Sequence, residues 1–425
     1  MMTRMLRLSL PIIVITALLQ RAAAVETPTL ETIEKTARQL ASPLSTERIT
    51  GEEWLESNAS AAFAELARLI KHGDIKQQTR AANAASVLIS PWSRAVRQDA
   101  IHKGQIHLFQ PRRPVARPTN QQSAHLVRTA ALSTISRTLK QRKARKSDND
   151  ADGKRPKFPG WEATEQVRVL CGCIAEVADM DAANKVAELI SKEPNRFLAG
   201  YMMGVLDTYH GLPRSYAWYG ICGNSTPEEF RQFDIAETVR CKKATAKLLD
   251  WHKQHANKPL TQRIDAALDV WDKRIVEQEH FAYYTDSGEW ATQTYYATMI
   301  RLGEPAVEAM RKRAARANVD KYWHRGAYEI VLGAITGEVD REFVEKMFQG
   351  ETFEKMLACE IIAAAGSRDF KDQLAAMVQS HGPYKKASYT LAVVYRSEAV
   401  SILQKAHADD FVASCAIAEL REWGE

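Results

Sequence analysis

The chain has 425 residues, 26% of them charged, and six cysteines. This length and low cysteine content exclude a small disulfide scaffold and leave room for a substantial core or an extended array of elements. Most of the cysteines are interpreted as buried small residues. The formal charge of +6 is a poor guide to partners, because the basic residues are concentrated in one segment.

The first 24 residues have the pattern of a secretory signal peptide. Arg4 and Arg7 precede an apolar run over residues 8 to 19, and a small-residue cleavage site follows at residues 22 to 24. A membrane-spanning helix needs about 20 apolar residues, so this run favours a cleaved signal over an anchor. We therefore expect an exported protein, periplasmic or secreted, without a membrane-spanning segment once residues 1–24 are removed.

Residues 25–104 are predicted to form an N-terminal helical region. Apolar residues recur at helical spacing in TIEKTARQL, SAAFAELARLIKHG and IKQQTRAANAASVLI. The last of these segments is expected to end before Pro91, because proline disfavours helix at its own position and at the one before it.

Residues 105–160 form a proline-rich and basic insert with one predicted helix, over residues 121 to 140. Twelve lysines or arginines and a single acid, Asp99, lie between residues 97 and 146. A solvated linker is the preferred interpretation, because so polar a segment buries little apolar surface. The alternative is a contact surface for an anionic glycan, a lipid headgroup or an acidic protein, while nucleic acid is disfavoured as a partner of an exported chain. The basic residues that would make this contact are Arg112, Arg113, Arg117, Arg142, Lys143, Arg145 and Lys146.

Three aspartates of the insert match the start of a calcium-binding loop. Asp148, Asp150 and Asp152 alternate and are followed by Gly153, so their carboxylates could face one cation. The match fails at the twelfth position, where Pro159 replaces the glutamate that should complete the coordination shell. We favour a solvated acidic spacer over a calcium site and expect no cofactor.

Residues 161–289 form a helical region that is rich in aromatic side chains. Residues 197 to 296 hold 16 of the 34 Phe, Trp and Tyr residues of the chain. Filling a core between widely spaced helices is the default explanation. Alternatively, Tyr216, Trp218 and Tyr219, in a loop rich in glycine, proline and serine, stack on a sugar or a peptide. His252 and His255 could share a helix face, but no third metal ligand lies near them.

Residues 290–425 contain paired helices that recur about every 30 residues. Their breaks are predicted at Gly303, Gly337, Gly366 and Arg396. At Gly303 the helix end requires a residue that tolerates positive φ, and Pro305 suits the first turn of the next helix. Because one such pair cannot bury its own apolar face, the pairs are expected to stack on one another.

The segment LGEPAVEAMRKRA, with its Gly-Glu-Pro-Ala-Val corner, resembles the short, 30-residue type of the HEAT repeat family. The resemblance covers residues 290 to about 407 and, more weakly, 161 to 192. It implies an all-α fold, an α-solenoid of stacked antiparallel helix pairs that follows the signal peptide and carries the basic insert. No functional residue is carried over from this resemblance, because the family includes scaffolds, adaptors and enzyme subunits.

For function, the sequence favours a non-catalytic scaffold that binds a protein or another macromolecule on its concave face. No nucleophile, metal or phosphate motif is present in the sequence, and exposed binding surface is what solenoids offer. The alternative is an enzyme of the α/α-toroid kind acting on an anionic polysaccharide. Tyr209, His210 and Arg214 have the residue types that remove a proton next to a carboxylate and neutralise its charge.

Overall fold

The computed structural model describes residues 27–40, 42, 45–89, 121–149, 161–216, 226–277, 296–317, 322–380, 385–406 and 410–422. Every regular element in these ranges is a helix and none is a strand, which confirms the predicted all-α class. The predicted signal peptide, residues 1–24, and the arginine- and proline-rich segment of the insert lie outside the described residues.

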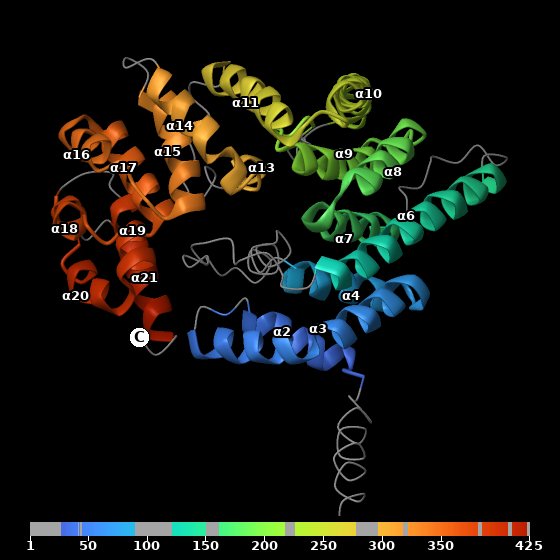
Figure 1. Cartoon of the computed structure of the whole chain (residues 1–425), viewed down its shortest axis with the longest axis horizontal. Helices are drawn as coiled ribbons and strands as arrows, with labels where there is room; N and C mark the ends of the chain where they lie inside the picture. The colour runs from blue at the N-terminus through green and yellow to red at the C-terminus, as the bar shows by residue number, and fades with distance from the viewer. Residues whose placement is uncertain are drawn as a thin grey trace, which may run out of the picture.

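The helices follow one another around an arc, and in the view of Figure 1 the C-terminal end comes round towards the first helix. The first part of the arc contains α2 (Leu30–Leu40), α3 (Ser45–His72), α4 (Ile75–Ile89), α6 (Gln121–Asn149), α7 (Trp161–Val177), α8 (Met180–Ser191), α9 (Arg196–His210) and α10 (Pro227–His255). The second part contains α11 (Leu260–Glu277), α13 (Ala297–Ile300), the 3-10 turn η2 (Glu304–Ala306), α14 (Val307–Arg316), α15 (Tyr322–Thr336), α16 (Arg341–Gln349), α17 (Thr352–Ala365), α18 (Lys371–Gln379), α19 (Lys385–Tyr395), η3 (Arg396–Ala399), α20 (Val400–Leu403) and α21 (Phe411–Glu422).

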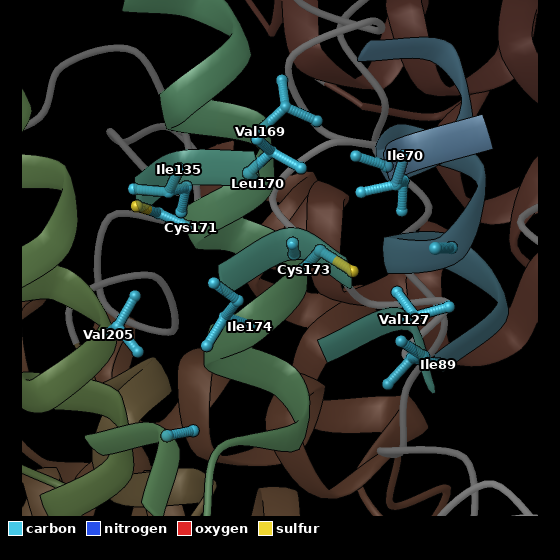
Figure 2. Packing of buried hydrophobic residues seen from close by; sticks show 14 of the residues in the cluster. Ile70, Ile89, Val127, Ile135, Val169, Leu170, Cys171, Cys173, Ile174 and Val205 are labelled. Carbon is cyan, nitrogen blue, oxygen red and sulfur yellow. The ribbon is translucent and has the colours of Figure 1, made fainter. Parts of the chain in front are cut away.

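One hydrophobic core fills the first part of the arc, and Figure 2 shows its centre. Ile70, Ile89, Val127 and Ile174 come from four helices and are all at most 5% exposed. Burial of this kind stabilises a fold by roughly 1.5–3 kcal/mol per large aliphatic side chain. Segments far apart in the sequence are therefore joined here by the removal of apolar surface from water.

Helix α6 packs against α3 and α7 within this core, and it continues to Asn149, nine residues beyond the expected end at residue 140. The polar stretch after residue 140 is thus helical at its start, where a disordered linker is the expectation from the sequence. Gln141, Ala144 and the neighbouring lysines and arginines have high helix propensity, so a helix already nucleated by packing continues through them.

The cysteines of the described residues form no disulfide with one another, and four of them, at positions 171, 173, 241 and 359, are buried. Cys171 and Cys173 point to different sides of α7 (Figure 2). Burial raises the pKa of the Cys171 thiol above its ordinary value. These four side chains therefore act as small core residues, as the sequence indicates.

The second core is built from two layers of helices. Helices α15, α17, α19 and α21 pack on one another in series, and each of α14, α16 and α18 packs against the next helix of that series. In Figure 1 the helices α17, α19 and α21 lie on the inner side of the arc, and α16, α18 and α20 lie outside them. This arrangement is compatible with the predicted α-solenoid.

All four predicted breaks have positive backbone φ, with values of 65° at Gly303, 75° at Gly337, 67° at Gly366 and 57° at Arg396. Arg396 is the one non-glycine residue with positive φ among the described positions. Positive φ therefore recurs at the predicted corners, with an arginine where the earlier units have glycine, although ψ differs between Gly303 (−160°) and Gly366 (28°).

Gly366→Ala is expected to lower the free energy of unfolding by about 1–2 kcal/mol, because an L side chain disfavours the left-handed conformation of this cap. Urea unfolding measures the change. Gly172→Ala in α7 is the control, since an added Cβ there meets only Ser86 Oγ at 4.0 Å and the helical backbone suits alanine. Equal stability of Gly366→Ala and the unmodified protein would contradict the left-handed corner.

The two cores meet at α11, which contributes Ala267 to the first core and Leu268 and Trp271 to the second. Trp271 Nε1 donates a hydrogen bond to the carbonyl oxygen of Gly211 at 2.7 Å. Thr298 Oγ1 donates to the carbonyl oxygen of Leu212 at 2.6 Å. The turn after α9 is thereby fixed to the first elements of the second core.

Candidate functional site

Many of the basic and acidic candidates of the insert lie beyond the part of the chain that the structure describes. Arg112, Arg113, Arg117, Asp150 and Asp152 fall in such segments, as do the loop aromatics Trp218 and Tyr219. Lys143, Arg145, Lys146 and Asp148 lie on the last turns of α6, where the backbone alone is described. Their proposed contacts with an anionic partner or with calcium therefore stay predictions.

Two of the predicted ligand-binding residues have described side chains, and both have partners within the protein. Arg142 Nη1 donates to Glu193 Oε1 at 3.1 Å. Tyr216 is 8% exposed and its hydroxyl donates to Glu237 Oε2 at 3.0 Å. The Arg240 guanidinium lies 4.7 Å from the centroid of the Tyr216 ring. Tyr216 therefore packs in the core, which is the default explanation for the aromatics.

His210 lies in a buried cluster of rings at the junction of α8, α9 and α10. Its Nε2 and the Nδ1 of His252 are 2.8 Å apart, and the Nε2 of His252 is 3.0 Å from Asn184 Oδ1. The Trp251 ring meets the His210 ring edge-on at 4.6 Å between centroids. Burial, together with the nearby charges of His252 and Arg263, lowers the pKa of His210 to about 3. Its imidazole is neutral and enclosed.

The three residues of the enzyme alternative are not assembled around a shared space. The rings of Tyr209 and His210 are in contact, with centroids 4.7 Å apart. Arg214 is exposed beyond the turn at Gly211. Burial raises the pKa of the Asp207 carboxyl to about 7, and the hydrogen bonds from Ser215 and the charge of Arg214 oppose only part of this rise. A general base must reach the proton that it removes, and His210 at 2% exposure does not face solvent.

His252 and His255 do not share a metal site. His252 points to His210 and Asn184, whereas the His255 ring stacks on Trp251 at 4.1 Å between centroids and its Nδ1 contacts the Trp251 carbonyl oxygen at 2.9 Å. Within the described ranges no group of three or more His, Cys, Asp or Glu side chains has the geometry to hold a metal ion.

A groove between α11 and α14, with a volume of about 540 Å³, is the candidate site. Asp265, Asp269 and Asp272 recur at intervals of four and three residues, so they share one face of α11 and form an acidic wall. Lys312, Arg313 and Arg316 face them from α14. The start of α15 closes one end of the groove with His324.

Asp272 on α11 forms polar contacts with side chains of both α14 and α15, and thereby links three helices at the groove. The Tyr328 hydroxyl donates to Asp272 Oδ1 at 2.5 Å, and His324 Nε2 lies 3.1 Å from the same oxygen. Arg313 Nη1 donates to Oδ2. Burial alone would raise the pKa of the Asp272 carboxyl, but the hydrogen bonds from His324, Tyr328 and Arg313 outweigh it and hold this pKa below the ordinary value.

The other two aspartates hold Arg313 against the acidic wall. Arg313 Nη2 lies 2.8 Å from Asp269 Oδ1 and donates to the backbone carbonyl oxygen of Asp265 at 3.1 Å. The Asp265 and Asp269 side chains are still 64% and 65% exposed. The guanidinium is thus fixed, while two carboxylates remain available to a ligand.

The groove carries nearly balanced charge. Three aspartates and Glu308 oppose Lys312, Arg313 and Arg316, and Lys312 pairs with Glu308 at 3.3 Å. A polyanion would gain little here, because the carboxylates repel it as strongly as the cations attract it. A polypeptide segment with both basic and acidic groups is the better match.

Tyr328→Phe is expected to lower the free energy of unfolding by about 1.5–3 kcal/mol, because the hydroxyl donates to a charged and partly buried carboxylate. Tyr209→Phe is the control, since no described residue forms a hydrogen bond with the Tyr209 hydroxyl. Its expected change is within about 0.5 kcal/mol. Denaturant unfolding at neutral pH measures both variants. Equally small changes would show that the Tyr328–Asp272 contact contributes little.

The sequence contains one signal for this groove, which is the spacing of Asp265, Asp269 and Asp272 on a helix. The partners Arg313, His324 and Tyr328 lie 41 to 56 residues away from Asp272, and no local pattern connects them. No protein-family model, curated protein or solved structure matches this chain. None of the helices in the described ranges is both long and apolar enough to cross a membrane.

Proposed function

We propose that this protein is an exported, HEAT-like, non-catalytic scaffold that holds a polypeptide segment of a partner, with the groove between α11 and α14 as its anchoring site. The observation that carries the proposal is the pair of oppositely charged walls, with Arg313 immobilised between them. A fixed guanidinium loses little side-chain freedom when a ligand binds, so the groove is organised for recognition before the partner arrives.

The arrangement of helices supports a scaffold in a second way. Helices α15, α17, α19 and α21 pack in series, the C-terminal half of α17 is largely buried, and α15 packs against α14 beside the groove. His210, the candidate base of the alternative enzyme, is enclosed by Trp251 and His252. Binding on a rigid array requires no reacting group.

A peptide-display selection on the purified mature chain tests this proposal. We expect enrichment of short peptides that carry both acidic and basic residues. Loss of one carboxylate, in Asp265→Asn or Asp269→Asn, is expected to weaken the binding of these peptides several-fold. The double variant Asp265→Asn/Asp269→Asn is expected to weaken it more than tenfold. The matched control is Glu345→Gln on α16, because Glu345 is an exposed carboxylate that pairs with Arg341 on the same helix.

The readout is the dissociation constant of a selected peptide, with thermal unfolding measured in parallel to show that the variants are folded. Selection of no peptide, or equal binding by Asp265→Asn/Asp269→Asn and by Glu345→Gln, would overturn the proposed site. Enrichment of purely acidic peptides would instead point away from the groove and towards one of the basic surfaces.

A further inference from the structure

The solvent-facing side of α10 combines exposed aliphatic side chains with lysines that form no ion pair with a described residue. Val239 is 62% exposed and Ile235 is 50% exposed, and Val239 has the largest exposed fraction of any large hydrophobic residue in the described ranges. They are four residues apart, so they lie one above the other on the same face. A single exposed aliphatic residue is ordinary, but an aligned pair on one helix face is a feature to explain.

Four exposed lysines, at positions 242, 243, 247 and 253, follow this pair along the helix. At about 100° per residue, Lys242 and Lys253 lie on one side of Val239, and Lys243 and Lys247 lie on the other. None of the four forms an ion pair with any described residue. The exposed face therefore has an aliphatic centre between two rows of ammonium groups.

The acidic groups on α10 cancel only a part of this charge. Glu228 and Glu229 lie in the first turn, where Glu229 completes a capping box with Thr226. Glu237 Oε2 forms an ion pair with Arg240 Nη2 at 2.7 Å, and Asp234 forms an ion pair with Arg196. Asp250 is the one acid within the lysine segment, and it accepts a hydrogen bond from Gln254 at 2.7 Å. At about 100° per residue it lies between the two rows of lysines, so its charge offsets one of the four ammonium groups.

The orientation of this face is fixed by the opposite side of the helix. Cys241, Leu248 and His252 are each at most 5% exposed and pack towards α8 and α9. Helix α10 cannot rotate to hide Ile235 and Val239 without exposing these side chains. The outward position of the aliphatic pair and the lysines is therefore a property of the fold.

We propose that this face of α10 binds the surface of a membrane that contains anionic lipids. Lysines that flank aliphatic residues can place their stems along the acyl boundary and their ammonium groups among phosphates, while the aliphatic residues enter the interface. The segment from 235 to 253 is about 27 Å long and offers roughly 200–300 Å² on one side. A stable protein–protein interface needs about 800 Å² from each partner, so a lipid surface fits this small face better than a folded protein.

This surface is separate from the groove between α11 and α14, and the inference does not depend on the proposed peptide binding. It assigns the chain a peripheral attachment to the envelope through α10. The proline-rich and basic insert is a further basic segment of the same chain, so the experiment has to change α10 and leave the insert intact.

The test is co-sedimentation of the mature chain with vesicles of phosphatidylcholine and phosphatidylglycerol, compared with vesicles of phosphatidylcholine alone. The unmodified protein is expected to bind the anionic vesicles and to be released at about 1 M salt, which screens the charges. Each lysine near an anionic surface contributes about fivefold to partitioning, so Lys242→Gln/Lys243→Gln should bind about 25-fold more weakly. Val239→Ser is expected to weaken binding by at least about threefold, because it removes apolar surface from the interface.

Matched control variants remove two exposed lysines, or one exposed aliphatic side chain, outside α10. Lys185→Gln/Lys192→Gln removes two exposed lysines, one on α8 and one at its C-terminal cap, that pair with Glu188. Ile49→Ser removes an aliphatic side chain that is 53% exposed on α3. Both controls are expected to bind vesicles as the unmodified protein does. If the α10 variants bind as strongly as these controls, or if the unmodified protein ignores anionic vesicles, the proposal is overturned. A photo-crosslinker placed at position 239 that captures a protein instead of lipid would overturn it in favour of a protein partner.

Discussion

Glu360→Ala is expected to lower the free energy of unfolding by about 3–5 kcal/mol, the largest single effect that we predict for this chain. Glu360 Oε1 forms an ion pair with Lys386 Nζ between α17 and α19, and the two side chains are 15% and 13% exposed. Burial lowers the pKa of Lys386 to about 8. Removal of the carboxylate leaves the ammonium group in this low-dielectric position without its partner.

The pH dependence of the stability of Glu360→Ala follows from the direction in which folding shifts the pKa of Lys386. Lys386 has a lower pKa in the folded chain than in the unfolded chain, where the ordinary value is about 10.4. The unfolded state therefore binds more protons between these two values, and stability rises with pH there. We therefore expect the free energy of unfolding of Glu360→Ala, in which no carboxylate opposes this shift of the Lys386 pKa, to increase between pH 8 and pH 10.

A double substitution separates the cost of an unpaired charge from the cost of lost packing. Glu360→Leu/Lys386→Met is expected to be more stable than Glu360→Ala, because no buried charge remains. Glu345→Ala, which breaks the exposed pair with Arg341, is the control and should cost less than about 1 kcal/mol. Denaturant unfolding at neutral pH compares all three, and equal costs for Glu360→Ala and Glu345→Ala would refute the prediction.

The second large effect is a loss of stability in mild acid caused by the His210–His252 pair. Burial is the main cause that lowers the pKa of His210 to about 3, and it also lowers the pKa of His252. As pH falls through about 6.5, the unfolded chain binds a proton at each histidine before the folded chain does. The contribution of His210 to stability should therefore fall by about 1.4 kcal/mol per pH unit, reaching about 3 kcal/mol near pH 4. Asp207, whose pKa burial raises to about 7, contributes in the opposite direction over the same range, so the effect of His210 is measured as a difference between variants.

His210→Phe isolates this contribution, because phenylalanine keeps an aromatic ring beside Trp251 and does not titrate. Its stability should vary less steeply between pH 6.5 and pH 4 than that of the unmodified chain. His72→Phe removes an exposed histidine at the end of α3 and should leave the slope unchanged. Urea unfolding at a series of pH values measures the slopes, and identical slopes for all three proteins would contradict the prediction.

The features that the sequence predicts well are those set by short stretches of chain. The all-α class follows from helical spacing of apolar residues, and the corners follow from Gly303, Gly337 and Gly366, which adopt the conformation that glycine tolerates best. The break at Arg396 was also predictable from the period alone, although arginine gives no local signal for positive φ.

The features that the sequence does not reveal depend on residues brought together over long distances. Asp272 and Tyr328 are 56 positions apart, and His210 and His252 are 42 apart, so neither pair leaves a local pattern. Tyr216 illustrates a different limit. A loop rich in glycine and proline suggests exposure, but Glu237 and Arg240 on the following helix cover its ring and hydroxyl.

The position of α11 between the two cores has a practical consequence. Asn257 and Lys258 are exposed in the short turn before this helix, and the second core begins with Ile264 on α11 itself. A cut in that turn would divide the chain into two fragments, each containing one of the two hydrophobic cores. The fragments would reassociate through α11, which contributes side chains to both cores. Separate expression of the two fragments would provide a complementation assay, which reports on any ligand that strengthens or weakens the association of the fragments through α11.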